Sequence, residues 1–439
     1  MKIMILGASH GGMESLDASR KLYPDAEIEM IEHDDLGHKM GWTKEEKMAK
    51  LTALAATNTL IKENTEMIAL MPSTHQVQLA DLITGTISTA NYDKLILAPG
   101  AQAVQLPIPG LDNQAIMSLR SKADMNNMRL KAGINDIKNI VIIGAGYIEM
   151  GAVEPFVTKG KHVTVIDTGS RVLGSYLDSE LTDSIEADLK QRGVTLALGE
   201  RVKQFDGDTE HRVTQVITDK KVYPADLVIL SVGTKPNTDW LQGTLELSSK
   251  GIIQTDEYQY TSAADVFAIG DATDIFYTPA NQKMNISLAG NARRQARNAV
   301  RNLVQPSVSL HGVQGTSALP LFDFKFATTG LSGQMANKLG IPTGSVIVEA
   351  PANLLPNAEK IQLKLRYRSD NLQLVGAQLM STVDHTELIN VLSMAINQKL
   401  TLTKLMDEDF FFQPVFTGAN NIIVTAAEQA LLNETATSK

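Results

Sequence analysis

The sequence predicts an α/β fold with two Rossmann-like dinucleotide-binding domains and a smaller C-terminal α+β domain. Three observations support this prediction. An apolar strand, a glycine-rich turn and a helix occur in the same order twice, in residues 2–12 and 139–151. Several other apolar runs end in glycine, as expected of buried parallel strands whose ends approach a ligand. After about residue 311, apolar and polar residues alternate, which is typical of antiparallel strands.

The first copy of this pattern begins with 2-KIMILGASHGG-12, and its second strand ends at Glu32. We expect Gly7 to make the tight turn, Ser9 to leave room for a pyrophosphate, and Gly12 to let the helix pack on the strand. The N-terminus of the helix would offer N–H donors to the phosphates. Glu32 lies 25 positions after Gly7 and would accept a hydrogen bond from a ribose hydroxyl group.

The second copy begins with 139-NIVIIGAGYIEMG-151, and its second strand ends at Asp167. Gly144 and Gly146 stand where Gly7 and Ser9 stand in the first copy. Asp167 follows Gly144 by 23 positions, close to the spacing of about 20 that is typical of dinucleotide-binding units. Two copies therefore predict two nucleotide-binding domains.

Three further apolar runs, 94-KLILAPG-100, 227-LVILSVG-233 and 266-VFAIG-270, read as buried parallel strands that end in glycine. Asp271 follows the last of them. Its carboxylate could bind a sugar or ribityl hydroxyl group, or it could cap the next turn. The residue pattern alone leaves both roles open.

The C-terminal part has a different pattern. Residues 361–368 and 372–380 predict an antiparallel hairpin with one solvated face, and residues 386–400 have helical spacing. The aromatic cluster 410-FFFQPVF-416 has too many phenylalanines for one face of a strand or helix. It predicts an interface, within the chain or between subunits, or else a corner of the core.

Composition excludes several classes of function. The net charge of −9 gives no basic surface for nucleic acid. The absence of cysteine excludes disulfides, thiolate metal sites and thiol nucleophiles. The sequence has no His/Asp/Glu cluster with metal-ligand spacing and no apolar run long enough to span a membrane. The N-terminus does not read as a signal peptide, so we expect a cytoplasmic protein without a metal.

In eight segments the chain resembles the FAD-dependent pyridine nucleotide–disulfide oxidoreductase family, most closely its NADH peroxidase/NADH oxidase branch. These segments occur in family order and span nearly the whole chain: GASHGGMES, NYDKLILAPGA, VTVIDTGSRVLGSYLD, LSVGTKPNTDWL, TSAADVFAIGDATD, NISLAGNARRQARNAV, HGVQGTSA and EDFFFQPVF.

The resemblance implies a glutathione-reductase-like organisation. An FAD-binding domain in two parts (1–110 and 237–310) would enclose an NAD-binding domain (111–236), followed by a dimerisation domain (311–439). A homodimer or a dimer of dimers is expected. The residues implied around FAD are Gly7, Ser9, Gly11, Gly12, Glu32, Pro99, Gly100, Ala101, Arg120, Gly270, Asp271, Ser287 and Ala289. Those implied around NADH are Gly144, Gly146, Tyr147, Asp167, Tyr176 and Gly233, and Asp167 favours NADH over NADPH. His10 matches the family's active-site histidine.

One departure from the family pattern concerns the redox cysteine, which the family carries just after the Glu32 region. Residues 36–61 do not match the family and are shorter, and Met40 cannot replace a thiol because a thioether has no thiolate form. A thiol-based mechanism is therefore excluded. His33, His38 or Trp42 could cover the flavin instead, but we expect a solvated loop here.

The other departure lies in the second glycine turn. Glu149 replaces the third glycine of the family pattern, and Gly151 replaces a glutamate that approaches the nicotinamide. At 4–8 Å from a pyrophosphate, a carboxylate would cost on the order of 2–4 kcal/mol at an effective dielectric constant of about 20. We expect weakened NADH binding, unless the helix shifts and Glu149 points to solvent.

The sequence is compatible with two functions. In the first, the protein is an FAD-dependent NADH oxidoreductase that passes electrons to O₂ or another small acceptor, with His10 as a proton donor beside the flavin. In the second, it is a catalytically impaired FAD-binding homologue, and His10 is only a polar residue that bonds to backbone.

Overall fold

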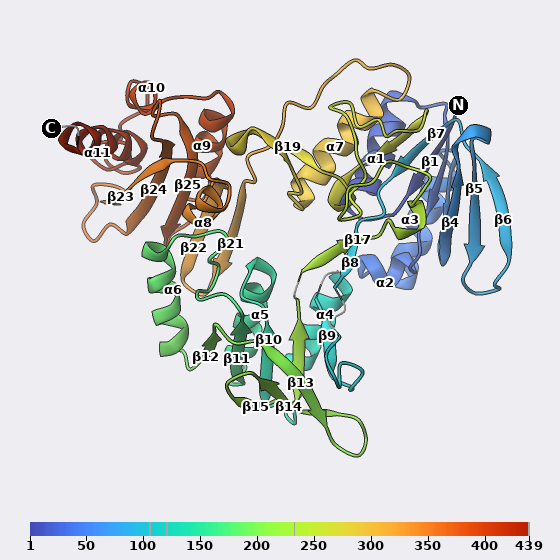
Figure 1. The fold of residues 1–439 in the computed structure, drawn as a ribbon, viewed down its shortest axis with the longest axis horizontal. Helices are drawn as coiled ribbons and strands as arrows, with labels where there is room; N and C mark the ends of the chain where they lie inside the picture. The colour runs from blue at the N-terminus through green and yellow to red at the C-terminus, as the bar shows by residue number, and fades with distance from the viewer. Residues whose placement is uncertain (105–106, 120–121, 232, 438–439) are drawn as a thin grey trace.

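The structure is a computed structural model that describes residues 1–104, 107–119, 122–231 and 233–437. It has three parts, each built on a five-stranded sheet (Figure 1). The predicted α/β class with a C-terminal α+β domain is confirmed. Arg120, expected near the cofactor, lies outside the described residues.

The first domain has a parallel sheet in the order β18-β7-β1-β2-β3. Alternate residues of β1 face two cores, with Ile3 and Ile5 in one and Met4 in the other. Helices α1 and α7 pack against each other on the first of these faces. The bounds are β1 Lys2–Leu6, α1 His10–Leu22, β2 Glu27–Ile31, β3 Thr59–Lys62, β7 Lys94–Leu97, β18 Val266–Ala268 and α7 Ala289–Arg301.

Smaller elements complete the first domain. An antiparallel sheet of β4 (Thr65–Met71), β5 (Gln76–Asp81) and β6 (Ile87–Asn91) contributes to its second core. The pair β19 (Ile275–Tyr277) and β20 (Gln282–Met284) leads towards the third domain. Short 3₁₀ helices are η1 Pro72–Thr74, η2 Asp239–Leu241, η3 Gly270–Ala272 and η4 Thr278–Ala280.

The second domain repeats the parallel arrangement in the order β12-β11-β10-β16-β9. A short antiparallel pair, β8 with β17, joins it to the first domain. The bounds are β8 Ala101–Ala103, β9 Ile116–Ser118, α4 Lys122–Ala132, β10 Asn139–Ile143, α5 Tyr147–Val157, β11 His162–Asp167, α6 Ser179–Gln191, β12 Thr195–Leu198, β13 Val202–Gly207, β14 Val213–Thr218, β15 Val222–Pro224, β16 Leu227–Leu230 and β17 Thr234–Pro236.

The third domain is an antiparallel sheet in the order β21-β22-β25-β24-β23 with helices against it. Its bounds are β21 Ser317–Leu321, β22 Phe324–Gly330, α8 Gly333–Lys338, β23 Thr343–Pro351, β24 Lys360–Arg368, β25 Leu374–Ser381, α9 Leu388–Asn397, α10 Leu402–Met406 and α11 Ile422–Thr437. The predicted hairpin is confirmed as β24–β25, and the predicted helix is α9.

The prediction of a solvated face is wrong for β25, in which every residue is buried. Ala377 and Leu379 pack in the core that contains α9 and α11, whereas Met380 packs in the core of the second domain. β25 is therefore a central strand covered on both faces.

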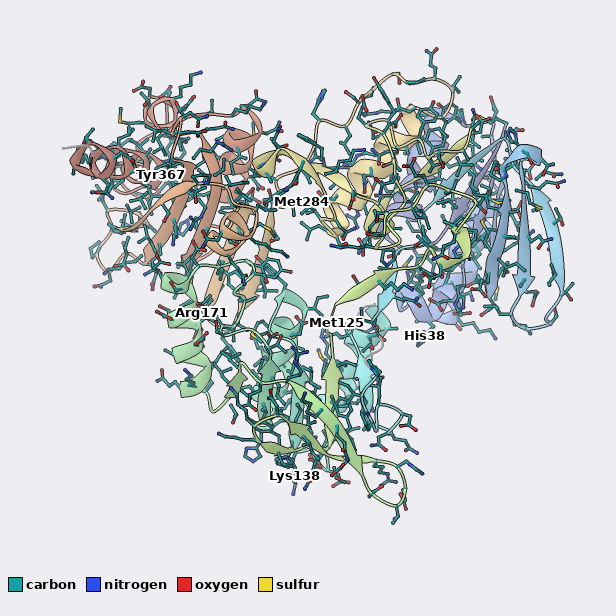
Figure 2. The ribbon with its side chains drawn as sticks, in the orientation of Figure 1. His38, Met125, Lys138, Arg171, Met284 and Tyr367 are labelled. Atoms are coloured by element: carbon teal, nitrogen blue, oxygen red, sulfur yellow. The ribbon has the colours of Figure 1, made fainter. Side chains whose placement is uncertain are left out.

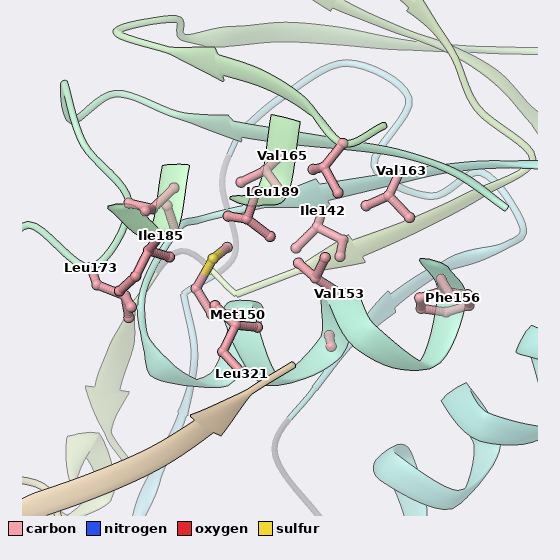
Figure 3. Packing of buried hydrophobic residues seen from close by; sticks show 14 of the residues in the cluster. Ile142, Met150, Val153, Phe156, Val163, Val165, Leu173, Ile185, Leu189 and Leu321 are labelled. Carbon is pink, nitrogen blue, oxygen red and sulfur yellow. The ribbon is translucent and has the colours of Figure 1, made fainter. Parts of the chain in front are cut away.

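The second and third domains share one hydrophobic core (Figure 3). Leu321 at the end of β21 packs with Met150 and Val153 of α5, and Phe326 of β22 belongs to the same cluster. A polar contact supports this packing, because the backbone N–H of Phe322 donates to Glu154 of α5 at 3.1 Å. The third-domain sheet thus packs on the face of α5 that points away from the sheet of the second domain.

The aromatic cluster after α10 divides into one packed residue and an exposed group. Phe410 packs on the third-domain core. Phe411, Phe412 and Phe416 are 60–69% exposed, beside the exposed Leu354, whose N–H donates to Pro414 O at 2.8 Å. A corner of this chain's own core is therefore the wrong assignment for these three phenylalanines.

Candidate functional site: two glycine turns and a bounded cavity

The first glycine turn joins β1 to α1 and leaves no room for side chains. A Cβ atom on Gly7 would lie 2.3 Å from Ala98 O, and one on Gly12 would lie 1.7 Å from Gly7 O. Gly7 also has a φ of +92°, in the region that favours glycine. Both glycines are therefore required by the backbone itself, and Gly11 beside Gly12 is buried.

The acid at the end of β2 is tied to this turn. Glu32 is 1% exposed, and its Oε2 accepts the N–H of Ala8 at 2.6 Å. Its Oε1 accepts from the N–H of Asp34 at 3.0 Å and from Lys39 Nζ at 2.6 Å. Glu32 thus stands at the turn, as predicted, and Lys39 neutralises its charge. No sequence pattern indicated Lys39, because it lies in the segment without family features.

The other residues expected around FAD lie at the ends of neighbouring strands. Pro99, Gly100 and Ala101 follow β7, which pairs with β1, and Gly270 and Asp271 follow β18, which pairs with β7. Parallel strands bring their carboxyl ends to one edge of the sheet. A side chain on Gly100 would meet nothing within 4 Å, so this edge is open.

Helix α7 approaches the same edge from the second chain segment. The N–H of Gly270 donates to Gln295 of α7 at 2.9 Å. Asn285 donates to the carbonyl oxygen of Asp271 at 3.0 Å and accepts from Ser287 at 2.7 Å. Ala289 is the first residue of α7. Three features together fit a flavin dinucleotide. They are a glycine turn without space for side chains, a buried acid and an open strand edge.

His10 is the first residue of α1 and is exposed. Its Nδ1 lies 3.3 Å from Nη2 of Arg293 on α7. A guanidinium group only donates hydrogen bonds, so Nδ1 is the acceptor and the ring proton is on Nε2. His10 can therefore offer an N–H outward from the start of the helix.

The prediction of a loop holds at His33 and Trp42 but is wrong at His38, because the divergent segment after Glu32 is mostly helical. It forms α2 (Leu36–Met40) and α3 (Lys44–Ala55). Asp35 caps α2, and Thr43 caps α3 in a reciprocal capping box with Glu46. Asp35, and Thr43 with Glu46 three positions later, are sequence signals for the starts of these two helices.

The surface of this segment is solvated, as expected. His33 and His38 are exposed, while Met40 and Trp42 pack partly against the core of the first domain. Lys50 covers the Trp42 ring at 5.0 Å. Helix α2 lies beside α4 of the second domain, near the labelled His38 and Met125 (Figure 2).

The second glycine turn has the same backbone plan. The N–H of Gly144 donates to Ile166 O at 2.8 Å, and the N–H of Ala145 donates to Asp167 Oδ2 at 2.8 Å. Asp167 Oδ1 also accepts from the N–H of Gly169 at 2.5 Å. Asp167 therefore stands where the sequence predicted, held by two backbone N–H groups.

Glu149 occupies this turn. It is 5% exposed, and its Oε2 lies 2.8 Å from the position of a Cβ on Gly146. Burial raises the pKa of Glu149, and the negative charge of Asp167 adds to this; hydrogen bonds from Ser231 and from the N–H groups of Gly146 and Glu149 oppose the shift. The interpretation that Glu149 points to solvent is wrong.

Two tyrosines expected near NADH lie together at this turn. The rings of Tyr147 and Tyr176 meet edge to face, with centroids 4.2 Å apart. Ser317 of β21 donates to the hydroxyl oxygen of Tyr147 at 3.0 Å. Gly233, which follows β16, has a φ of +99° and open space around it.

A cavity of about 450 Å³ extends from this turn to the third domain. One wall is the loop after β11, which includes the labelled Arg171 (Figure 2). The opposite wall comes from α8 and β24 and includes Gln334, Lys364 and Arg366. The sequence could not reveal this wall, because Gln334, Lys364 and Arg366 lie 167 to 199 positions beyond Asp167.

Asp178 links the two walls of the cavity. It lies 2.9 Å from Lys364 Nζ and 2.5 Å from Arg366 Nη2, and it accepts the N–H of Gly333 at 2.8 Å. Burial alone would raise its pKa, but the hydrogen bond from Lys364 and the charges of Arg366 and Lys364 hold the pKa at about 2. The second and third domains are thus joined by charge as well as by their common core.

Two features are absent from the described ranges, a metal-binding cluster and a membrane-spanning helix. No group of three or more His, Asp or Glu side chains there could hold a metal ion. No helix in that part of the chain is both long and apolar enough to cross a membrane.

Comparison with known proteins agrees with this geometry. Residues 1–296 match the family described as "Pyridine nucleotide-disulphide oxidoreductase", and residues 316–421 match its dimerisation domain. An NADH oxidase of Enterococcus faecalis is 35% identical over 453 aligned positions, which cover 99% of this chain and 100% of that protein. A coenzyme A disulfide reductase of Staphylococcus aureus is 25% identical, with 96% and 98% covered.

Solved structures give the same result. The structure of a water-forming NADH oxidase from Lactobacillus brevis, bound to NADH, superimposes with a TM-score of 0.93 at 32% identity and covers all of both chains. An NAD-dependent persulfide reductase from A. fulgidus superimposes with a TM-score of 0.90 at 26% identity, over 99% of this chain and 84% of that one.

Proposed function

The chain belongs to the pyridine nucleotide-disulphide oxidoreductase family, and from this premise we propose that it is an FAD-dependent NADH oxidase. The overall reaction is NADH + H⁺ + O₂ → NAD⁺ + H₂O₂, with another small acceptor, such as a quinone, as a substitute for O₂. FAD, when bound, supplies the two-electron carrier between the nicotinamide and O₂. The observation that carries this proposal is the pair of matching turns in a chain without cysteine.

The described residues have separate tasks in this proposal. Glu32 and the N-terminus of α1 would hold the ribose and phosphates of FAD, and Asp167 would hold the adenosine ribose of NADH. Tyr147 and Tyr176 bound the second turn, where they would pack beside bound NADH. His10 offers its Nε2–H as a hydrogen-bond donor.

The product is hydrogen peroxide because the chain lacks a second redox group. Reduction of O₂ to water takes four electrons, and a flavin carries two. A thiol could hold the next pair or reduce peroxide through a sulfenic acid. With no cysteine in 439 residues, neither thiol route exists.

Oxygen-electrode measurements on the FAD-loaded protein test this proposal. We expect one NADH oxidised for each O₂ consumed, and catalase should return half of the consumed oxygen. Free FAD at the same concentration is the control. Two NADH for each O₂, with no peroxide, would overturn the peroxide-forming reaction.

The second candidate is a catalytically impaired FAD-binding homologue, and the Glu149 carboxyl group in the nucleotide turn favours it. An anaerobic absorption spectrum separates the two candidates. FAD bands that bleach within seconds of NADH addition support the oxidase. Bands that persist support the impaired homologue.

Three further assignments accompany the proposed function. We propose domain limits of 1–110 with 237–310, 111–236 and 311–439, supported by the pairing of β18 with β7. We also propose a homodimer or a dimer of dimers. The matched dimerisation domain and the exposed Phe411, Phe412 and Phe416 support it. The cytoplasmic location remains a prediction from the sequence.

A further inference from the structure

The side chain of Glu149 folds back onto the turn that precedes its own helix. Its Cγ lies 2.9 Å from the position of a Cβ on Gly144, and its Oε2 lies 2.8 Å from that on Gly146. The Ser231 hydroxyl group and the N–H groups of Glu149 and Gly146 lie close enough to this carboxyl group to oppose the rise in its pKa that burial causes. The buried carboxyl group therefore occupies the space beside the N–H groups of the turn.

These N–H groups are the donors that a dinucleotide uses. The first N–H groups of an α-helix have no partner within the helix, and the helix dipole makes this end attractive to anions. In dinucleotide-binding units the pyrophosphate takes these donors. Helix α5 has 11 residues and begins directly after Gly146. The Glu149 carboxyl group and a pyrophosphate therefore need the same donors.

We propose that the Glu149 carboxyl group is a built-in occupant of the pyrophosphate position, and that it is displaced, or takes up a proton from solvent, when a dinucleotide binds. This inference rests on the proposed function and adds a control on substrate binding. The adenosine end should be less affected, because Asp167 lines the cavity that extends from the turn and Glu149 is not among the residues that line it. Glu149 thus selects against the pyrophosphate and not against the nucleoside.

The charges around Glu149 make this displacement depend on pH. Asp167 at the end of β11 repels the ionised carboxyl group, and Tyr176 in the following loop faces the same space. A bound pyrophosphate would add negative charge beside them. Protonation of Glu149 removes the repulsion, so binding should take up protons and should be tighter at lower pH.

Binding of two non-reacting probes to the FAD-loaded protein tests the inference. ADP-ribose carries the pyrophosphate, and adenosine does not. Calorimetric titrations between about pH 5.5 and 8.5, in two buffers of different ionisation enthalpy, give affinity and proton uptake together. The variants are Glu149→Gly, which removes the side chain, and Glu149→Gln, which removes only its charge. Glu210→Gln, on the exposed β13–β14 hairpin, is the matched control.

We expect Glu149→Gly to bind ADP-ribose about 10- to 100-fold more tightly, and adenosine within about threefold of the original protein. Proton uptake with ADP-ribose should be present in the original protein and the control, and absent in both Glu149 variants. Equal affinities without proton uptake, together with flavin bleaching by NADH, would overturn the inference and leave the oxidase intact. No binding by any variant and no bleaching would overturn both. If Glu149→Gly fails to fold, proton uptake in the original protein and in Glu149→Gln decides the matter.

Discussion

The two glycine turns of this chain follow one plan and differ at one position. In both, the first glycine donates to the residue just before the acid at the end of the neighbouring strand, and the next N–H donates to that acid. Gly12 and Glu149 each follow the first glycine by five positions. The first turn excludes any side chain there, because a Cβ on Gly12 would lie 1.7 Å from Gly7 O.

Glu149 carries a Cβ at the equivalent position, so α1 and α5 cannot stand at the same distance from their turns. The comparison shows that the pattern of backbone hydrogen bonds does not fix the space for a ligand. In the first turn, no side chain at the position of Gly12 occupies the space beside the N–H groups. The second has the same N–H groups, but its own carboxyl group occupies them.

The strongest way to break this comparison is to place the residue of the second turn in the first. Gly12→Glu should destabilise the first domain by more than about 4 kcal/mol, because its Cβ would overlap a backbone oxygen. Loss of bound FAD, read from the absorbance ratio after purification, is the measurement. Glu149→Gly is the reciprocal control and should keep its FAD. A Gly12→Glu protein that purifies with FAD would show that the first turn can open as the second does.

The sequence predicted most of the frame of both turns, because spacing and residue size carry that information. The spacing along the sequence correctly predicted the positions of Gly7, Glu32, Gly144 and Asp167 in the two turns. Lys39, Arg293 and the cavity wall of the third domain could not be predicted in this way. Their contacts join residues far apart in the chain, and no local pattern reports such contacts. The caps of α2 and α3 were present in the sequence as Asp35 and Thr43.

A second difference between the two turns is Asp178, which joins the cavity at the second turn to the third domain. Asp178→Asn should cost about 2–4 kcal/mol at pH 7, because it leaves Lys364 and Arg366 without their shared carboxylate. The lowered pKa of about 2 means that the contribution of Asp178 is complete above pH 3.8, its ordinary value, and is lost as the pH falls towards 2. Urea-unfolding midpoints of both proteins should therefore differ at pH 7 and converge near pH 2. A constant difference would contradict this.

The acids of the two turns also differ in their partners. Glu32 has Lys39 at 2.6 Å, whereas Asp167 is held by two backbone N–H groups. Lys39→Gln should weaken FAD binding by about 1 kcal/mol, or roughly fivefold, because a buried carboxylate loses its cation. Fluorescence titration of the FAD-depleted protein measures this effect. Lys44→Gln, at the exposed start of α3, should have no effect, and an equal loss in both variants would exclude a specific role for Lys39.

The smallest expected effect is the contribution of Glu149 to the free energy of unfolding. This contribution changes with pH in the opposite direction to that of Asp178. Burial raises the pKa of Glu149, so the ionised form is less stable in the folded protein than in the unfolded chain. Its contribution therefore falls as the pH rises from the ordinary value of 4.5 through the raised pKa. Glu149→Gln should gain up to about 1 kcal/mol at pH 8 and almost nothing at pH 4.5, measured by urea unfolding of the FAD-loaded protein. A gain that is largest at low pH would mean that the turn stabilises the carboxylate as it would stabilise a phosphate, and that Glu149 contributes to the fold as its helix cap.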